Sequence, residues 1–389
     1  MNARVIKKKD NYYVALEWTE KGKRKTKSVS VRKRLGLNRP ALAREANALR
    51  DKIMHEYRQG IYVEPSDMLL KEYLTQWLED YAKPNIKPKT YDIYKNMVDN
   101  HLAPGLGNIP VGKLRPTQLK GFYAKKLKGG RADGKPGGLS NRSVQYMHII
   151  LKLVLKSAVE DEMTTRNVAI DVTPPTVKKP KIRFWEWDNA KAFLASEKKK
   201  YDKGRGRYYP IYALALSTGM RRGELLGLHW RNINYKNKTL TICRSLVQTD
   251  DGPLLQDTLK TDSSYRILDI SDKTIEMLKA HRKRQAQEIL ALGLQDTGLV
   301  FTASTGNWVT PTNMDKYFRE AVGRAKLPKI GGMHSLRHTY ATRMLELGYS
   351  PRYVQERLGH ANIAITLGTY SHVTPKAKSE IATITDDIF

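Results

Sequence analysis

In the first 64 residues, the spacing of apolar side chains first predicts strands of a small sheet and then predicts a helix. Residues 12–18 (YYVALEW) are rich in aromatic and β-branched side chains, and residues 27–31 (KSVSV) alternate polar and apolar positions, as half-buried strands do. Lys21-Gly22-Lys23 predicts a turn between the two strands. From Pro40 onward, apolar side chains three or four positions apart predict one face of a helix. These side chains are Leu42, Ala46, Leu49, Ile53 and Tyr57.

Residues 65–173 read as helical throughout. Apolar stripes predict helices over 69–78, from about Thr90, over 117–127 and after Ser140 or Asn141, either of which can cap a helix. The last helix has a stripe of core residues, namely Val144, Met147, Ile150, Leu151, Val154 and Leu155. A turn-rich connection at 101–114 and an exposed Gly- and Pro-containing loop at 129–140 separate these helices.

A proline-rich, basic stretch at 173–181, TPPTVKKPK, predicts an interdomain linker, which we place at 174–181. Beyond it, residues 182–389 predict a mainly helical domain with a small sheet. The expected helices cover 187–199, 209–216, 222–228, 272–292, 313–325, 335–347, 351–358 and 363–370. The expected strands cover 239–246, 264–270 and 299–301. The fold class is therefore multidomain α+β: a small N-terminal sheet with a helix, a helical domain, and a mainly α domain with a small antiparallel sheet.

The charge of the chain points to a polyanionic partner. With 69 Lys and Arg against 39 Asp and Glu, the net charge is +30. A field of that size attracts DNA or RNA, although a ribosome-associated protein or a basic surface that aids solubility would also account for it. Residues 1–64 alone hold 17 basic and 7 acidic residues. A small sheet with basic and aromatic side chains on its outer face can lie in a DNA groove; the alternative is a solvated hairpin.

Other classes of protein are excluded by simpler features. The single cysteine, Cys243, excludes an intramolecular disulfide and a cysteine-cluster zinc site, and its apolar surroundings predict a small buried residue. The N-terminal sequence lacks the apolar core of a signal peptide, and no apolar run approaches the length of a membrane span. We therefore expect a cytoplasmic protein.

Two arginine-containing motifs suggest that the chain binds a phosphodiester. TGMRRGE (218–224) places Arg221 after a helix-breaking turn, and HSLRH (334–338) places His334 and Arg337 three residues apart on one helical face. A guanidinium donates two parallel hydrogen bonds to phosphate oxygens and keeps its charge. Two of them can neutralise the charge that develops in phosphoryl transfer.

The other candidates supply a nucleophile, a base and an acid. Tyr370, in GTYSHV, is the candidate nucleophile; a phenol attacks weakly unless a base takes its proton, and His334 is a candidate base. His360, in RLGH, can donate a hydrogen bond to the phosphate. Lys260, in LKTDSSYR between two predicted strands, can protonate the leaving 5′ oxygen from a hairpin tip.

Taken singly, each of these residues has an ordinary structural explanation. Arginines are common on basic surfaces, and Tyr340, Tyr349 and Tyr353 lie close to Tyr370 in the sequence. The ordered set, rather than any one member, favours catalysis.

The motifs together resemble the signature boxes of the tyrosine recombinase (phage integrase) family. The boxes are TGMRRGELLGL, HSLRHTYATRML, RLGHANIAITLGTY and YSHV. Upstream, residues 89–114 and 139–163 resemble the core-site-binding domain of that family. The basic N-terminal unit is similar to the arm-binding domain of integrases from conjugative transposons and temperate phages.

The resemblance implies a role for each candidate. Arg221 and Arg337 would clamp the scissile phosphate, and Arg221 is preferred to its neighbour Arg222 because it directly follows Thr-Gly-Met. Lys260 would protonate the leaving 5′-hydroxyl, His334 would assist proton transfer, and His360 would bind the phosphate. In addition, Tyr370 would form a 3′-phosphotyrosyl intermediate, while Glu224 would brace the site by hydrogen bonds.

The resemblance also implies an assembly and a domain plan. Four protomers would exchange strands between two double-stranded DNA sites through a Holliday junction, without ATP, metal or cofactor, to integrate and excise a mobile element. An excisionase or a DNA-bending protein would be the accessory partner. The implied domains are an arm-site-binding domain (1–64), a core-site-binding domain (65–173), a linker (174–181) and a catalytic domain with a C-terminal tail (182–389).

Three rival functions share some of these features. A type IB topoisomerase uses the same tyrosine chemistry to relax supercoils as a monomer, without an arm-binding unit. A non-catalytic DNA-binding regulator with this fold would have no use for the tyrosine. A basic RNA-binding protein would explain the charge but not the motifs.

Overall fold

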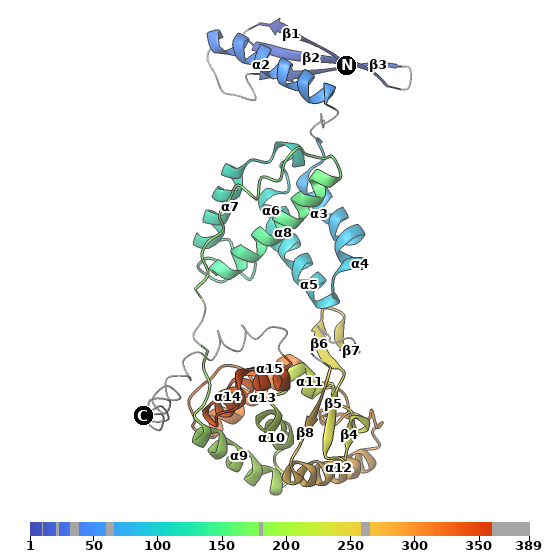
Figure 1. The fold of residues 1–389 in the computed structure, drawn as a ribbon, viewed down its shortest axis with the longest axis vertical. Coiled ribbons are helices and arrows are strands. Elements are labelled where there is room, and N and C mark those ends of the chain that lie inside the picture. The colour runs from blue at the N-terminus through green and yellow to red at the C-terminus, as the bar shows by residue number, and fades with distance from the viewer. Residues whose placement is uncertain are drawn as a thin grey trace, which may run out of the picture. The chain divides into compact units, whose positions relative to one another are not determined.

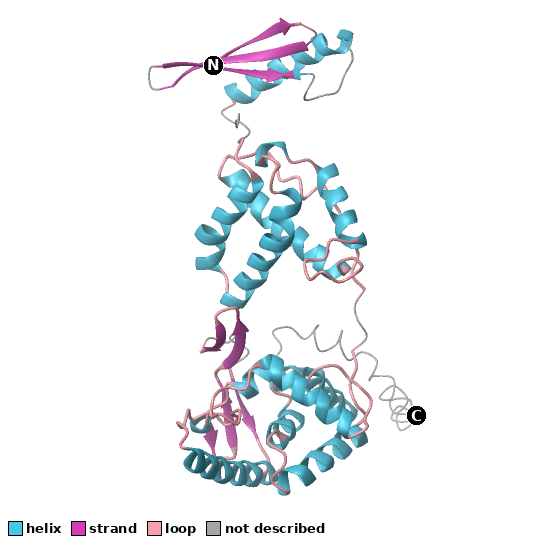
Figure 2. Cartoon of the chain, turned by 180° about the vertical axis from the view of Figure 1, so that it is seen from behind, coloured by secondary structure: helices cyan, strands magenta, loops and turns pink. Residues whose placement is uncertain are grey.

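The computed structural model describes residues 1–9, 11–20, 23–31, 39–59, 66–178, 182–257 and 265–359. The chain forms two compact units, Met1–Lys178 and Lys179–Phe389 (Figure 1). Helices make up most of the described chain, and the strands form small antiparallel sheets (Figure 2). The predicted fold class is therefore confirmed. No helix in these described ranges combines the length and the apolar character that crossing a membrane would require.

The N-terminal sheet is antiparallel and is covered on one face by a helix. Its strands β1 (Asn2–Lys8), β2 (Asn11–Glu20) and β3 (Lys23–Ser30) lie in that order, and α2 (Arg39–Arg58) packs on the sheet. Val14 and Leu16 form the core with residues of α2. Strand β1 was not predicted, because basic side chains obscure its alternation.

The aromatic side chains of β2 do not all lie where the sequence placed them. Tyr12 and Trp18 pack against the core under α2, so they do not belong to the outer face of the sheet. Basic residues of the other face, Arg4 and Arg24, instead flank Glu17 and pair with it. Tyr57, predicted on the apolar face of the helix, is exposed in its last turn.

The helices of residues 66–178 share one hydrophobic core. They are α3 (Leu70–Trp77), α4 (Lys83–Asn85), α5 (Pro88–Met97), α6 (Ala103–Leu106), α7 (Pro116–Lys128) and α8 (Asn141–Glu160), with π-helical turns at Leu78–Ala82 and Val98–Leu102 and a 3-10 turn at Val111–Lys113. Ser140 accepts a hydrogen bond from the backbone N–H of Ser143 at 3.1 Å, which confirms it as the cap of α8. The six stripe residues predicted for this helix are all buried.

The second unit is built mainly of helices around its own core. They are α9 (Trp187–Asp202), α10 (Tyr209–Thr218), α11 (Arg222–Leu226), α12 (Asp272–Leu292), α13 (Pro311–Arg324), α14 (His334–Glu346) and α15 (Pro351–Leu358), with a 3-10 turn at Trp230–Asn232. The limits predicted for α12 and α15 are confirmed at both ends. Serine side chains cap both N-termini, and a left-handed glycine follows each C-terminus. The predicted helix 363–370 lies outside the described residues.

The strands of this unit correct two predictions. Strands β4 (Ile233–Asn234), β5 (Thr239–Ile242) and β8 (Arg266–Asp269) form one sheet, whereas β6 (Ser245–Thr249) and β7 (Gly252–Gln256) form a separate hairpin. The single strand predicted over 239–246 is therefore wrong, because the chain changes sheets near Cys243, which is half-buried. The strand predicted at 299–301 is also wrong, since only Leu299 forms an isolated bridge, to His229.

Candidate functional site

A left-handed glycine turns the chain between α10 and α11 and presents Arg221. Gly219 ends α10 with φ +66°, and Arg221 is the residue that caps the five-residue helix α11. A Cβ at Gly219 would lie 2.5 Å from a ring carbon of Tyr340 and 2.6 Å from a methyl carbon of Leu358. Both the backbone angle and the space therefore require glycine at this turn.

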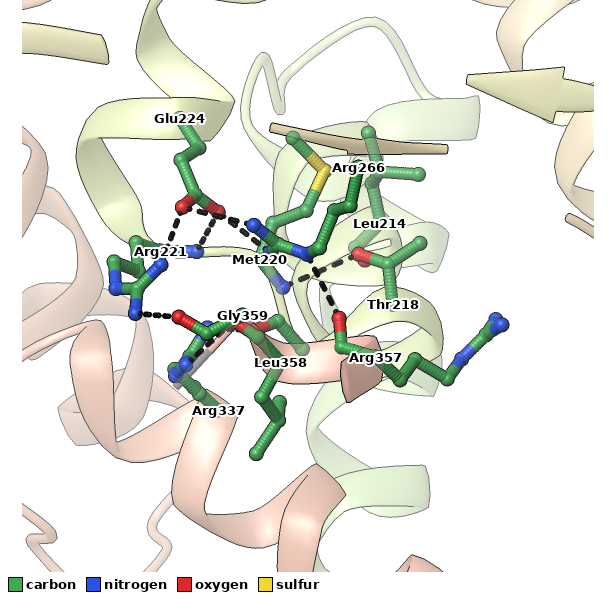
Figure 3. A network of polar contacts seen from close by, with 11 residues as sticks. Leu214, Thr218, Met220, Arg221, Glu224, Arg266, Arg337, Arg357, Leu358 and Gly359 are labelled. Atoms are coloured by element: carbon green, nitrogen blue, oxygen red, sulfur yellow. Dashed lines mark hydrogen bonds and ion pairs between the residues drawn. The ribbon is translucent and has the colours of Figure 1, made fainter. Parts of the chain in front are cut away.

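Glu224 lies at the centre of a polar network (Figure 3). Its carboxylate is 2% exposed and accepts hydrogen bonds from the backbone N–H of Arg221 at 2.9 Å and from the Nη1 of that arginine at 2.8 Å. Arg266 on β8 donates to the same carboxylate at 2.9 and 3.2 Å. A single buried negative charge is thus shared by two guanidinium groups.

Arg337 and Arg221 converge on the end of α15. Arg337 is 2% exposed; it donates one hydrogen bond to the carbonyl of Gly219 at 2.9 Å and another to that of Leu358 at 2.8 Å. Arg221 donates to the carbonyl of Gly359 at 2.5 Å. The three sequence boxes that contain these residues therefore meet in space, as Figure 3 shows.

Arg222 points to a different partner from Arg221. It forms an ion pair with Asp315 on α13, and the same carboxylate accepts the backbone N–H of Met333 at 3.0 Å. Arg222 therefore ties α11 to the start of α14, outside the Glu224 network. The two adjacent arginines therefore belong to different networks.

The position of His334 makes it a weakly basic imidazole. It is the first residue of α14, and its ring lies 5.1 Å from that of His338. Although part of the residue is exposed, surrounding protein displaces water and lowers the pKa of His334 to about 4; the positive charges of Arg337, His338 and Arg221 add to the shift. The sequence placed His334 and Arg337 on one face, but Arg337 is buried while His334 reaches solvent.

The surroundings of Glu224 also lower its pKa, but for a carboxyl this favours the charged form. Burial alone would raise the pKa of its carboxyl, yet Arg266 first and then Arg221 outweigh that effect and hold the pKa below its ordinary value. Glu224 is therefore ionised at neutral pH and attracts both arginines.

The remaining predicted residues lie outside the described part of the chain. They are Lys260, His360 and Tyr370. His360 directly follows Gly359, the residue that Arg221 reaches, and Lys260 precedes β8 by six positions. The described ranges thus bring together Arg221, Glu224, His334 and Arg337.

Arg266 is the site residue that the sequence analysis missed. Residues of β8 alternate between buried and exposed, so Arg266 has the same orientation as the buried Leu268. The sequence contained a signal for this orientation: Arg266 and Leu268 are two positions apart, and such residues lie on the same face of a strand. An arginine on the inner face of a strand needs a buried partner, and Glu224 is that partner.

Replacing Gly219 by alanine should destabilise the second unit. The left-handed backbone costs about 1 to 2 kcal/mol for a residue with a Cβ, and the clash with Tyr340 and Leu358 should add roughly 1 to 3 kcal/mol. Gly293→Ala is the matched control, because that glycine also has a positive φ, +59°, but no heavy atom lies within 4 Å of its added Cβ. Denaturant unfolding gives both values; equal losses would contradict the close packing at Gly219.

The pKa of His334 can be measured by NMR titration, with His334→Gln to assign its signal. We expect a value near 4 in the free protein, because nearby protein and cations disfavour the imidazolium. Protonation below about pH 6.5 would then favour the unfolded chain, whose histidine keeps its ordinary pKa. A phosphodiester bound between the arginines should raise the value. A free-protein pKa at or above 6.5 would contradict this electrostatic picture.

Comparison with known proteins is consistent with this geometry. The model of the phage integrase family matches residues 184–377, and the N-terminal SAM-like domain of phage integrases matches residues 69–127. A tyrosine recombinase XerC-like protein of Caldanaerobacter subterraneus subsp. tengcongensis is 30% identical over 89% of this chain and 90% of its own. The integrase of Staphylococcus phage L54a is 31% identical, covering 86% of this chain and 97% of its own.

The fold of a solved integrase agrees as well. The Tn1549 transposon integrase, solved in complex with transposon right end DNA, superposes with a TM-score of 0.67 at 21% identity and covers 82% of this chain and all of that one. The matches extend over both compact units. The sequence motifs that contain Arg221, Glu224 and Arg337 lie within residues 184–377, which match the phage integrase family model. The chain therefore belongs to the phage integrase family of tyrosine recombinases, which are enzymes of site-specific DNA recombination.

Proposed function

We propose that this chain cuts and rejoins double-stranded DNA at specific sites to integrate and excise a mobile element. The observation that carries the proposal is the convergence of Arg221 and Arg337 on the backbone of Leu358 and Gly359, next to His360 in the sequence. The similar proteins named above include an integrase of a phage and an integrase of a transposon, and this likeness supports the proposal.

The two arginines would bind the non-bridging oxygens of the scissile phosphate. Both guanidinium groups are oriented by hydrogen bonds to backbone carbonyls from another segment. Preorganised donors of this kind need no rearrangement when negative charge develops, and such electrostatic stabilisation is usually the largest contribution to rate. His360 would add a further hydrogen bond to the same phosphate.

Tyr370 would be the nucleophile of a transesterification. Its phenolic oxygen would form a bond to phosphorus, the bond from phosphorus to the 5′ oxygen would break, and a 3′-phosphotyrosyl intermediate would result. His334 would take the phenol proton, since its lowered pKa keeps it neutral at pH 7, and Lys260 would give a proton to the leaving oxygen. A 5′-hydroxyl of the partner strand would reverse these steps and conserve the bond energy.

The structure of nearby tyrosines supports the assignment to Tyr370. Tyr340 is buried and accepts a hydrogen bond from Nε of Arg357 at 2.5 Å, so its hydroxyl is engaged in packing α15 on α14. Tyr349 and Tyr353 stack on each other at 5.3 Å between ring centroids.

The assembly that we propose has four protomers on two DNA sites and a Holliday junction between two rounds of strand exchange. Residues 65–173 would bind the core site and residues 1–64 the arm site, with an excisionase or a DNA-bending protein as accessory partner. The net charge of +30 supports contact with DNA over more than one domain.

A nicked suicide DNA should trap a covalent complex with the wild-type protein. Tyr370→Phe should abolish the adduct, because phenylalanine has no hydroxyl to attack phosphorus, while Tyr349→Phe should retain it and serves as the matched control. Denaturing gels, with and without protease, give the readout. An adduct that survives in Tyr370→Phe would show that another residue is the nucleophile. DNA binding without any wild-type adduct would favour a non-catalytic regulator, and relaxation without exchange would favour a topoisomerase.

DNA affinity should fall steeply with salt. If the chain contacts six or more phosphates, the association constant should drop by about 10³-fold or more between roughly 50 and 200 mM salt, because condensed counterions are released on binding. Fluorescence anisotropy of the full-length protein and of a variant that lacks residues 1–64 would separate the contribution of residues 1–64 to the salt dependence from that of the remaining chain. A flat salt dependence would count against DNA contact by both.

A further inference from the structure

We propose that Arg266 is a positioning residue of the recombination reaction: it holds Glu224 so that Arg221 is oriented and available for the scissile phosphate. This inference rests on the proposed function. It concerns a residue that does not itself bind the phosphate, because Nε, Nη1 and Nη2 of its buried side chain all donate to Glu224 and to the carbonyl of Arg357.

Arg266 binds its partners as a rigid fork. Its Nη1 and Nη2 donate to the two oxygens of Glu224 at 3.2 and 2.9 Å, and its Nε donates to the carbonyl of Arg357 at 2.8 Å. One planar guanidinium therefore fixes α11 and the last turn of α15 relative to β8. Lysine has a single charged nitrogen and cannot reproduce this geometry.

The hydrogen bonds form a closed circuit through the site. Arg266 holds Glu224, Glu224 holds the backbone and side chain of Arg221, and Arg221 reaches Gly359, two residues from the carbonyl of Arg357 that Arg266 binds. The orientation of Arg221 thus depends on Arg266 at both ends of the circuit (Figure 3).

Arg266 also weakens the competition between Glu224 and a phosphate for binding to Arg221. A buried carboxylate attracts a guanidinium strongly, since little water screens the charges. When Arg266 shares that carboxylate, less of its negative charge acts on Arg221. Without Arg266, Glu224 would hold Arg221 more tightly and would oppose its binding to the negatively charged phosphodiester.

This competition makes a prediction that a purely structural role does not make. Arg266→Met should slow formation of the covalent adduct by about 10²-fold, the order of effect expected for a misplaced catalytic group. Adding Glu224→Gln to that variant should recover part of the rate, because the amide oxygen can still accept the N–H of Arg221 but carries no charge. If the double variant is as slow as Arg266→Met or slower, the competition is not the cause.

A second readout uses the charge of the substrate. A methylphosphonate at the scissile position replaces one charged oxygen by a methyl group, so cleavage depends less on the arginine clamp. The defect of Arg266→Met relative to wild type should therefore shrink on this DNA. A defect of the same size on both substrates would indicate general damage to the fold and would overturn the inference.

The experiment is a single-turnover assay on nicked suicide DNA at saturating full-length protein. Arg284→Met is the matched control, because Arg284 lies in the same unit and also binds backbone carbonyls, those of Tyr201 and Gly204, while its ion pair is with Glu288 and not with Glu224. Its cleavage rate should stay near that of wild type. Arg266→Lys keeps the charge and should be impaired less than Arg266→Met, so it provides the test if the methionine variant does not fold.

The outcomes separate this inference from the proposed function. Adduct formation by wild type with an unimpaired Arg266→Met would overturn only the role of Arg266. Failure of wild type to form an adduct on either DNA would overturn the proposed function together with this inference. Melting temperature and DNA affinity, measured for every variant, identify variants whose loss of rate comes from unfolding or lost binding.

Discussion

The buried carboxylate of Glu224 is the constraint on which the rest of the site depends. A charge with 2% exposure must be balanced by cations, and here Arg221 and Arg266 provide them from two different elements. Because both arginines also bind carbonyls at the end of α15, neutralising one carboxylate fixes three segments that are far apart in the sequence. With Arg337 nearby, the cluster keeps an excess of positive charge suited to an anionic ligand.

Local backbone geometry makes this electrostatic arrangement possible. The left-handed Gly219 ends α10 and redirects the chain so that Arg221 can cap α11, while the carbonyl of the same glycine accepts a hydrogen bond from Arg337. The left-handed Gly359 ends α15 in a comparable way, and the carbonyls of Leu358 and Gly359 accept hydrogen bonds from the arginines. Two helix ends thus become the framework of the site.

The sequence predicted those parts of the molecule that local signals determine. Serine caps and terminal glycines set both ends of α12 and α15, and the ordered boxes identified Arg221 and Arg337 as partners in one site. Strands β5 and β6 were predicted as one strand because strand-like alternation continues past Cys243 and no Gly or Pro marks the break there. Arg266 was missed because its role comes from Glu224, which is 42 residues away in the sequence and adjacent only in the fold.

The same excess of cations determines how His334 can act. In the protein without DNA, lost solvation and then the cationic neighbours lower the pKa of His334, so the ring is neutral but is a poor base. A phosphodiester bound between Arg221 and Arg337 would bring a negative charge close to these cations and raise the basicity of the ring. In the proposed reaction, proton transfer from Tyr370 would then be easier with substrate bound than without it. In this way the arrangement that binds the phosphate would also control the base that activates the nucleophile.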